Sequence, residues 1–179
     1  MNMWWCKNTD GFYMKDGFST IPKGSKEINE KAKEFYEKYR DEYEMDLSKV
    51  KKTPITMKNI FTAINKTKLL ESKMTEIDEA CTNAIYQGFG VMFGTKHVHF
   101  TYTIHDQINI QEALSMPNEF QFFKNGKFWT HEEVVIINQT GVKFKTDHRK
   151  YCNELKHYIS QLRDIRTIIS VTYGHHISG

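Results

Sequence analysis

The sequence predicts an α+β fold with a small N-terminal β-unit, a long amphipathic helix, then two hairpins and packed helices. Two observations predict it. Several segments repeat apolar residues every three or four positions, which is typical of amphipathic helices. Between them lie short runs of β-branched and aromatic residues joined by Gly-containing turns, as in hairpins. A polar connector suggests a boundary, with residues 1–50 forming a β-plus-helix head and residues 51–179 the main domain.

The head begins with short extended runs separated by a turn signal at residues 8–11, and residues 25–44 follow with helical periodicity. So small a unit cannot bury all of its aromatic side chains alone. They either dock on the main domain or form a partner-binding face, because Trp and Tyr favour interface cores. The side chains concerned are Trp4, Trp5, Phe12, Tyr13 and Phe18.

The longest periodic segment is a helix expected over residues 57–86. Its apolar positions alternate in steps of four and three, which suits a helix on a globular core and also a coiled-coil seam. They are Ile60, Ile64, Thr67, Leu70, Met74, Ile77, Cys81 and Ala84. We favour the helix on a core because Thr67 weakens the seam; a homo-oligomer or a partner helix is the alternative.

Two hairpins are expected, one over residues 89–102 with a turn at Gly94 and one over residues 120–129 around Asn125-Gly126. Between them, Thr103 and Asp106 have the spacing of a capping box. The helix that they open should end before Pro117. Its apolar positions suggest one buried face, made of Ile104, Ile108, Ile110 and Leu114.

The C-terminal part is expected to be mostly helical. Thr130 and Glu133 form a second capping-box pattern, and Gly141 is expected to interrupt the helical tract that follows. Another helix should follow around residues 148–162, and the β-branched run 165–173 should close the fold as a strand.

Composition excludes several classes of function. The net charge of +3 is spread along the chain, which argues against a nucleic-acid surface. The longest apolar run, residues 134–137, is far too short to span a bilayer, and the N-terminus lacks a signal-peptide pattern. Cys81 and Cys152 fall on apolar helical stripes, so they are expected to be buried free thiols in a protein made in a cytoplasm.

The sequence indicates catalytic and metal-binding residues only weakly. His97 and His99 lie on one side of a strand and could bind zinc, but two ligands do not make a site. His99-Phe-Thr101 is half of the signature of two-histidine phosphoesterases, and the second copy that such chemistry needs is missing from the sequence. A nucleophilic Cys81 or Cys152 with a histidine base stays open. We expect no cofactor, no metal and no enzymatic activity.

Asp106-Gln107-Ile-Asn109 is the strongest polar cluster. As structure, Asp106 caps the helix while Gln107 and Asn109 bond to backbone or to a partner; as catalysis, it would be an acid beside two amides. Capping already explains the acid, so the structural interpretation is favoured.

Two stretches resemble known phage proteins. Asp10–Tyr13 followed by Ile21–Ile28 resembles the opening of phage tail-fibre assembly proteins. From residue 77 to 173 the chain resembles an uncharacterised family encoded beside tail-fibre genes of Gram-positive phages and prophages. The residues that carry this second resemblance are Cys81, Ile85, Gly88–Val91, His99–Thr101, Asp106–Ile110, His148, Tyr151–Lys156 and Tyr173-Gly174.

The resemblance implies a tail accessory protein that helps tail fibres to assemble and binds a tail-fibre or baseplate protein. It would act in the bacterial cytoplasm during assembly, and its retention in the virion tail stays open. A permanent structural component of the baseplate or fibre is the alternative, and an anti-defence phosphodiesterase is a distant third.

Overall fold

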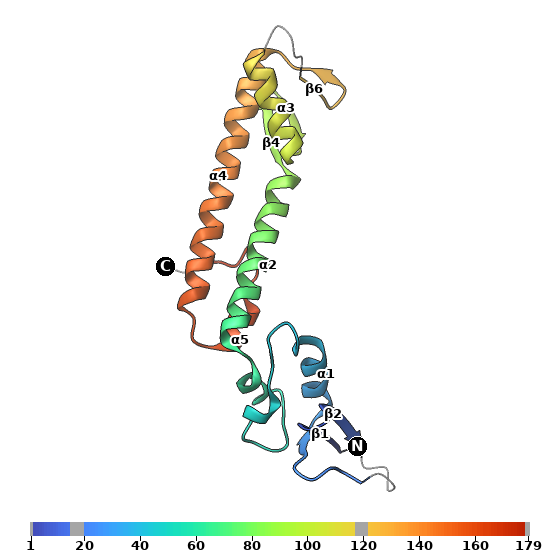
Figure 1. The fold of residues 1–179 in the computed structure, drawn as a ribbon. Coiled ribbons are helices and arrows are strands. Elements are labelled where there is room, and N and C mark those ends of the chain that lie inside the picture. Colours follow the sequence, from blue (N-terminus) through green and yellow to red (C-terminus); the bar gives the residue numbers. More distant parts are fainter. Residues whose placement is uncertain (1, 15–19, 117–121, 178–179) are drawn as a thin grey trace. The chain divides into compact units, whose positions relative to one another are not determined.

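The computed structural model describes residues 2–14, 20–116 and 122–177 and shows the expected α+β fold (Figure 1). The chain forms two compact units. The first comprises Met1–Met74 with Ile159–Val171, and the second comprises Thr75–Tyr158 with Thr172–Gly179. The division falls inside two long helices, whereas the sequence suggested a boundary in the connector near residue 50.

A three-stranded antiparallel sheet forms the N-terminal part of the first unit. Its order is β2-β1-β3, with β1 at Met3–Cys6, β2 at Gly11–Met14 and β3 at Lys26–Ile28. The predicted helix over residues 25–44 is shorter than expected, because β3 occupies its first turn. Helix α1 spans Glu30–Tyr39, and the Asn29 side chain caps it by accepting from the backbone N–H of Ala32.

The long helix also begins later than predicted. Helix α2 spans Lys66–Gln87, while Ile60–Ala63 is a 3₁₀ turn that follows another at Leu47–Lys49. Asn65 accounts for the later start, since its side-chain oxygen accepts from the N–H of Thr67 and so begins the helix there.

The prediction of a C-terminal strand over residues 165–173 is wrong. Ile165–Ser170 forms helix α5 because Asp164 caps it, accepting from the N–H of Thr167 at 2.9 Å. Its Ile168 and the following Val171 are fully buried. Lys73 donates to the carbonyl of Val171, and Lys66 to that of Leu162, so this segment is tied to the α2 residues of the first unit.

Both predicted hairpins are present in the second unit. Strand β4 (Phe89–Phe93) pairs with β5 (Lys96–Phe100), and β6 (Phe123–Lys124) pairs with β7 (Lys127–Phe128). Residues 120 and 121 of the second predicted hairpin lie outside the described residues. Helix α3, Ile104–Ser115, connects them.

Helix α4 (His131–Gln161) runs without interruption through Gly141, contrary to prediction. Within the second unit it lies beside α2 (Figure 1), where Lys156 donates to both carboxylate oxygens of Asp78. The apolar residues between the two helices include Ile77, Cys81, Cys152 and Leu155, all of them buried. This burial favours a helix packed on its own core over an exposed coiled-coil seam.

The close packing around position 141 requires a glycine. A Cβ atom there would lie 2.8 Å from ring carbons of both Phe89 and Tyr102, which are buried. The helix therefore passes so close to the β4–β5 hairpin that only glycine fits without displacing a ring.

Gly141→Ala should destabilise the protein by about 1 kcal/mol in urea unfolding. Alanine improves helix propensity by ~1 kcal/mol, but overpacking a buried contact typically costs about 1–3 kcal/mol, so the clash should outweigh the gain. Gln139→Ala, on the exposed side of the same helix, should change stability by no more than ~0.5 kcal/mol. A stabilised Gly141→Ala protein would contradict the close approach of these rings.

Candidate functional site

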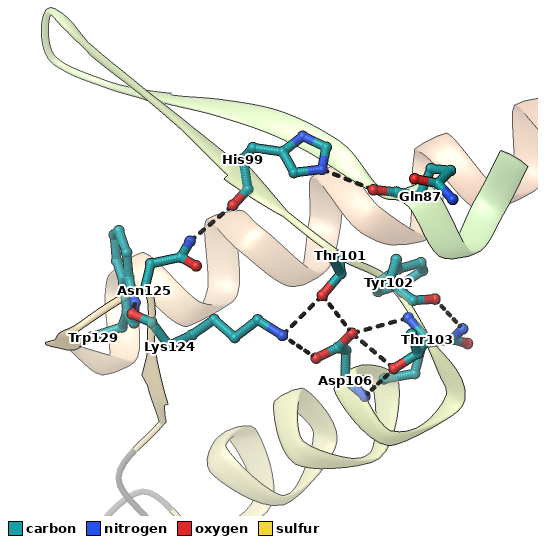
Figure 2. A network of polar contacts seen from close by, with 10 residues as sticks. Gln87, His99, Thr101, Tyr102, Thr103, Asp106, Lys124, Asn125 and Trp129 are labelled. Atoms are coloured by element: carbon teal, nitrogen blue, oxygen red, sulfur yellow. Dashed lines mark hydrogen bonds and ion pairs between the residues drawn. The ribbon is translucent and has the colours of Figure 1, made fainter.

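Asp106 is the centre of a polar network at the start of α3 (Figure 2). One carboxylate oxygen, Oδ2, accepts from the Thr101 hydroxyl at 2.8 Å and from the N–H and hydroxyl of Thr103 at 3.0 and 2.8 Å. The N–H of Asp106 in turn donates to the Thr103 hydroxyl, which completes the predicted capping box. The other oxygen, Oδ1, accepts from the ammonium of Lys124 on β6.

The network keeps Asp106 ionised. Burial of this carboxyl alone would raise its pKa, but hydrogen bonds from Lys124, Thr103 and Thr101 outweigh burial and lower the pKa below its usual value. Lys124 also donates to the Thr101 hydroxyl at 2.9 Å. A carboxylate engaged by four donors is suited to holding segments together and has little free capacity to move a proton in a reaction.

Further hydrogen bonds join the neighbouring segments. Asn125 donates to the carbonyl of His99, and the indole N–H of Trp129 donates to that of Lys124, which ties the β6–β7 turn to β5 and to the residues after β7 (Figure 2). Gln107 donates to the carbonyl of Tyr102 and accepts from Lys145 on α4. The site is therefore a clamp on the two hairpins, α3 and α4.

The exposed face of α3 differs from the prediction. Ile110 is buried as expected, and Leu114 is half-buried, but Ile104 and Ile108 are 59% and 48% exposed. The buried positions of this helix are Asp106, Ile110 and Ala113, which are spaced by four and three residues. Since Asp106 must point inward to reach Lys124, the helix is rotated so that Ile104 and Ile108 face outward.

These side chains line a shallow groove along α3, with a volume of about 410 Å³. Met116, 42% exposed, lies at its far end, and the rest of the lining is polar, formed by Gln107, Gln111, Glu112 and Ser115. Two further exposed aromatic side chains, Phe123 and Phe128, pack against each other on the β6–β7 hairpin with ring centroids 4.8 Å apart. Asn109 is exposed on α3.

The predicted N-terminal binding face is less available than its sequence suggests. Trp5 is 4% exposed, donates its indole N–H to Asp10 at 2.8 Å and packs edge-on against Tyr36 of α1. Trp4, Phe12 and Tyr13 are half-buried, and Phe12 also contacts Tyr36. The head thus has a small core of its own, which sequence reasoning missed; Phe18 lies outside the described residues.

His97 and His99 are exposed on β5 but serve local contacts. The His99 Nε2 atom lies 2.8 Å from the carbonyl oxygen of Gln87, and the His97 ring lies against Gly90, where a Cβ would meet it at 2.0 Å. In the described part of the chain, no group of three or more His, Cys, Asp or Glu residues is placed to hold a metal ion.

Both candidate nucleophiles are buried free thiols, as expected. Burial, together with a hydrogen bond to Asp78 and the neighbouring Cys81, raises the pKa of Cys152 to about 12, so its thiolate is scarce at neutral pH. The Cys81 thiol points to the backbone carbonyl of His148 at 3.6 Å, while the His148 ring contacts the Tyr173 hydroxyl at 2.6 Å. Neither arrangement pairs a thiol with an imidazole base.

Comparisons of the chain with protein-family profiles, with curated proteins and with solved structures gave no match. None of the helices in the described ranges is both long and apolar enough to cross a membrane.

Proposed function

We propose that this protein is a non-enzymatic accessory protein of a phage tail that binds a tail-fibre or baseplate protein during assembly. The observation that supports binding is the outward-facing apolar side of α3, formed by Ile104, Ile108 and Met116 along one groove. Apolar side chains that share an exposed groove are typical of protein-binding surfaces. The sequence resemblance described above supports a tail protein as the partner.

The hydrogen bonds around Asp106 hold α3, and with it the groove, in a fixed position. Because Asp106, Gln107 and Lys124 fix α3 against the hairpins and α4, the groove needs no reordering to bind. Intertwined fibres have many contacts between distant residues and exposed strand edges, so they fold slowly and aggregate unless they are covered. An apolar groove on a stable small protein could cover such a surface in the bacterial cytoplasm until the fibre is complete.

Quantitative mass spectrometry of finished tail particles tests this function. A chaperone should be absent from particles or substoichiometric, and the fibre should become insoluble when its gene is deleted. A fixed ratio to the fibre would instead make it a permanent structural component, which is the alternative proposal. Absence from particles with no effect on the fibre would contradict both.

Ile108→Glu should weaken binding to the fibre encoded in the same phage or prophage at least tenfold, which corresponds to about 1.4 kcal/mol. The change places a charge in the apolar groove, yet the fold should tolerate it because Ile108 is 48% exposed. Met92→Glu, at an exposed apolar residue on β4, is the matched control and should bind normally. Co-purification and titration calorimetry measure the effect, and equal binding of both variants would exclude the α3 groove as the contact.

A further inference from the structure

Four lysines gather around a cavity in the first unit, far from α3 in the sequence. Lys49, Lys51, Lys52 and Lys58 line a space of about 530 Å³ together with the buried Val50. Three of these lysines are nearly consecutive in what the sequence suggests is a polar connector. The fold adds Lys58 from the next turn, and so converts a run of charges into a concave site.

The backbone around this cavity is held by other cations of the same unit. The Lys26 ammonium donates to the carbonyls of Leu47, Ser48 and Val50 at 3.2, 3.0 and 2.5 Å. Arg166 donates to the carbonyl of Lys58 at 2.8 Å. Both edges of the cavity are therefore fixed before any ligand arrives, which lowers the entropy cost of binding.

The positive charges of the four lysines are not neutralised by ion pairs with carboxylates of the described residues. All four are exposed, and no ion pair joins any of them to a carboxylate of the described chain. Asp46 is near enough for the charge of Lys49 to contribute to lowering the Asp46 pKa, but its own side chain is engaged by Ser48. Several like charges around one cavity repel each other, so an anionic ligand would relieve the repulsion.

The lining selects among anions. Its lining is mostly apolar, and lysines suit such a lining because their alkyl stems can lie along it while their charged ends reach water. The polar groups of Asn59 and Thr62 are already used, since Asn59 accepts from the N–H of Thr56 and Thr62 donates to the carbonyl of Asn59. Among the described residues, no aromatic ring lines the cavity, so they provide no stacking platform of the kind that single-stranded nucleic acids use.

We propose that this cavity, hereafter the lysine pocket, binds an acidic segment of a partner protein that carries one apolar side chain among its carboxylates. The apolar side chain enters the cavity, and the flanking carboxylates lie near the four ammonium groups. Neither contact uses the α3 groove, so the lysine pocket is a second binding site and does not depend on the proposed function.

Fluorescence anisotropy with the full chain tests the proposal. The probes are labelled acidic peptides of six residues with a central Phe, Leu or Trp flanked by Glu and Asp. Peptides with Gln and Asn in place of the acids, and peptides with a central Gly, are the comparison. At least one acidic peptide with an apolar centre should bind, and more weakly at high salt. Both comparison sets should bind at least tenfold more weakly.

Two variants locate the site. Lys51→Gln/Lys52→Gln/Lys58→Gln should weaken peptide binding at least tenfold, while the same loss of charge in Lys96→Gln/Lys143→Gln/Lys150→Gln should change it by no more than about twofold through long-range attraction alone. Thr62→Trp keeps every charge but fills the cavity, and it should also abolish binding of the apolar residue. Thermal unfolding of each variant checks that the fold is retained.

Several results would overturn the proposal. One is that none of the acidic peptides binds. Another is that the two triple variants lose affinity equally, which would indicate net charge without a site. A third is that a single-stranded oligonucleotide competes with the peptide and binds more tightly in a way that depends on Lys51, Lys52 and Lys58, which would assign the pocket to nucleic acid.

Discussion

Gly88→Ala should destabilise the second unit by about 3 kcal/mol, more than any surface substitution in this chain. Gly88 links α2 to β4 with φ at +90°, a conformation that costs a residue with a Cβ of order 1–3 kcal/mol. A Cβ there would also lie 1.8 Å from the carbonyl oxygen of Phe100 and 2.6 Å from Cα of Thr101. Because these are backbone atoms, the strand end itself must move, and the Phe89–Phe100 pairing that starts the hairpin should be lost.

Gly94→Ala is the matched control for this substitution. Gly94 also has a positive φ, +61°, but a Cβ there would meet no atom within 4 Å. It should therefore cost only the conformational strain, about 1–2 kcal/mol. Chemical denaturation and amide hydrogen exchange of β4 and β5 measure both variants. Equal losses would mean that strain alone, without the backbone contact, requires glycine at position 88.

Asp106→Asn should cost about 2 kcal/mol of stability. Breaking a buried ion pair by removing one partner typically costs about 3–5 kcal/mol, but the Lys124 side chain is 28% exposed and water recovers part of that. The amide oxygen can still accept from Thr103, so the loss reports mainly the contact with Lys124. Asp147→Asn, in the exposed pair with Lys143, should change stability by no more than ~0.5 kcal/mol.

The contribution of Asp106 to the stability of the wild-type protein depends on pH in a predictable way. The pKa of Asp106 is lowered in the folded protein, so in acid the unfolded chain binds this proton more readily than the folded one. The contribution of Asp106 is therefore fully present above the unfolded pKa, about 3.9, and is lost as the pH falls through the lower folded pKa. Urea unfolding of the wild type should lose stability more steeply below about pH 5 than Asp106→Asn does. Parallel curves would contradict the role given to this carboxylate.

The features that the sequence predicted well are local. Both capping boxes, at Thr103 with Asp106 and at Thr130 with Glu133, form as expected, because their partners lie three residues apart. The β4–β5 and β6–β7 hairpins also form, with Gly94 and the Asn125-Gly126 pair at their turns, all three at positive φ. Turn and cap chemistry act over a few residues, so no knowledge of tertiary contacts was needed.

The features that the sequence missed depend on distant residues. Periodicity predicted a buried face that included Ile104 and Ile108, but Lys124 attracts Asp106 inward and leaves these two side chains outside. Gly141 has the pattern of a helix breaker, yet the rings of Phe89 and Tyr102 beside it explain a glycine inside a continuous helix. The lysine pocket needed Lys58, which the turn before the second 3₁₀ helix brings to the other three lysines.

The first unit is assembled from two pieces of chain that are separated by residues 75–158, the larger part of the second unit. Its N-terminal piece, Met1–Met74, is complete only when Ile159–Val171 supplies α5 and the carbonyls that Lys66 and Lys73 bond. During synthesis on the ribosome, residues 75–158 must therefore emerge before the first unit can close. The first unit therefore cannot complete its fold until α5, the last helix among the described residues, has been made.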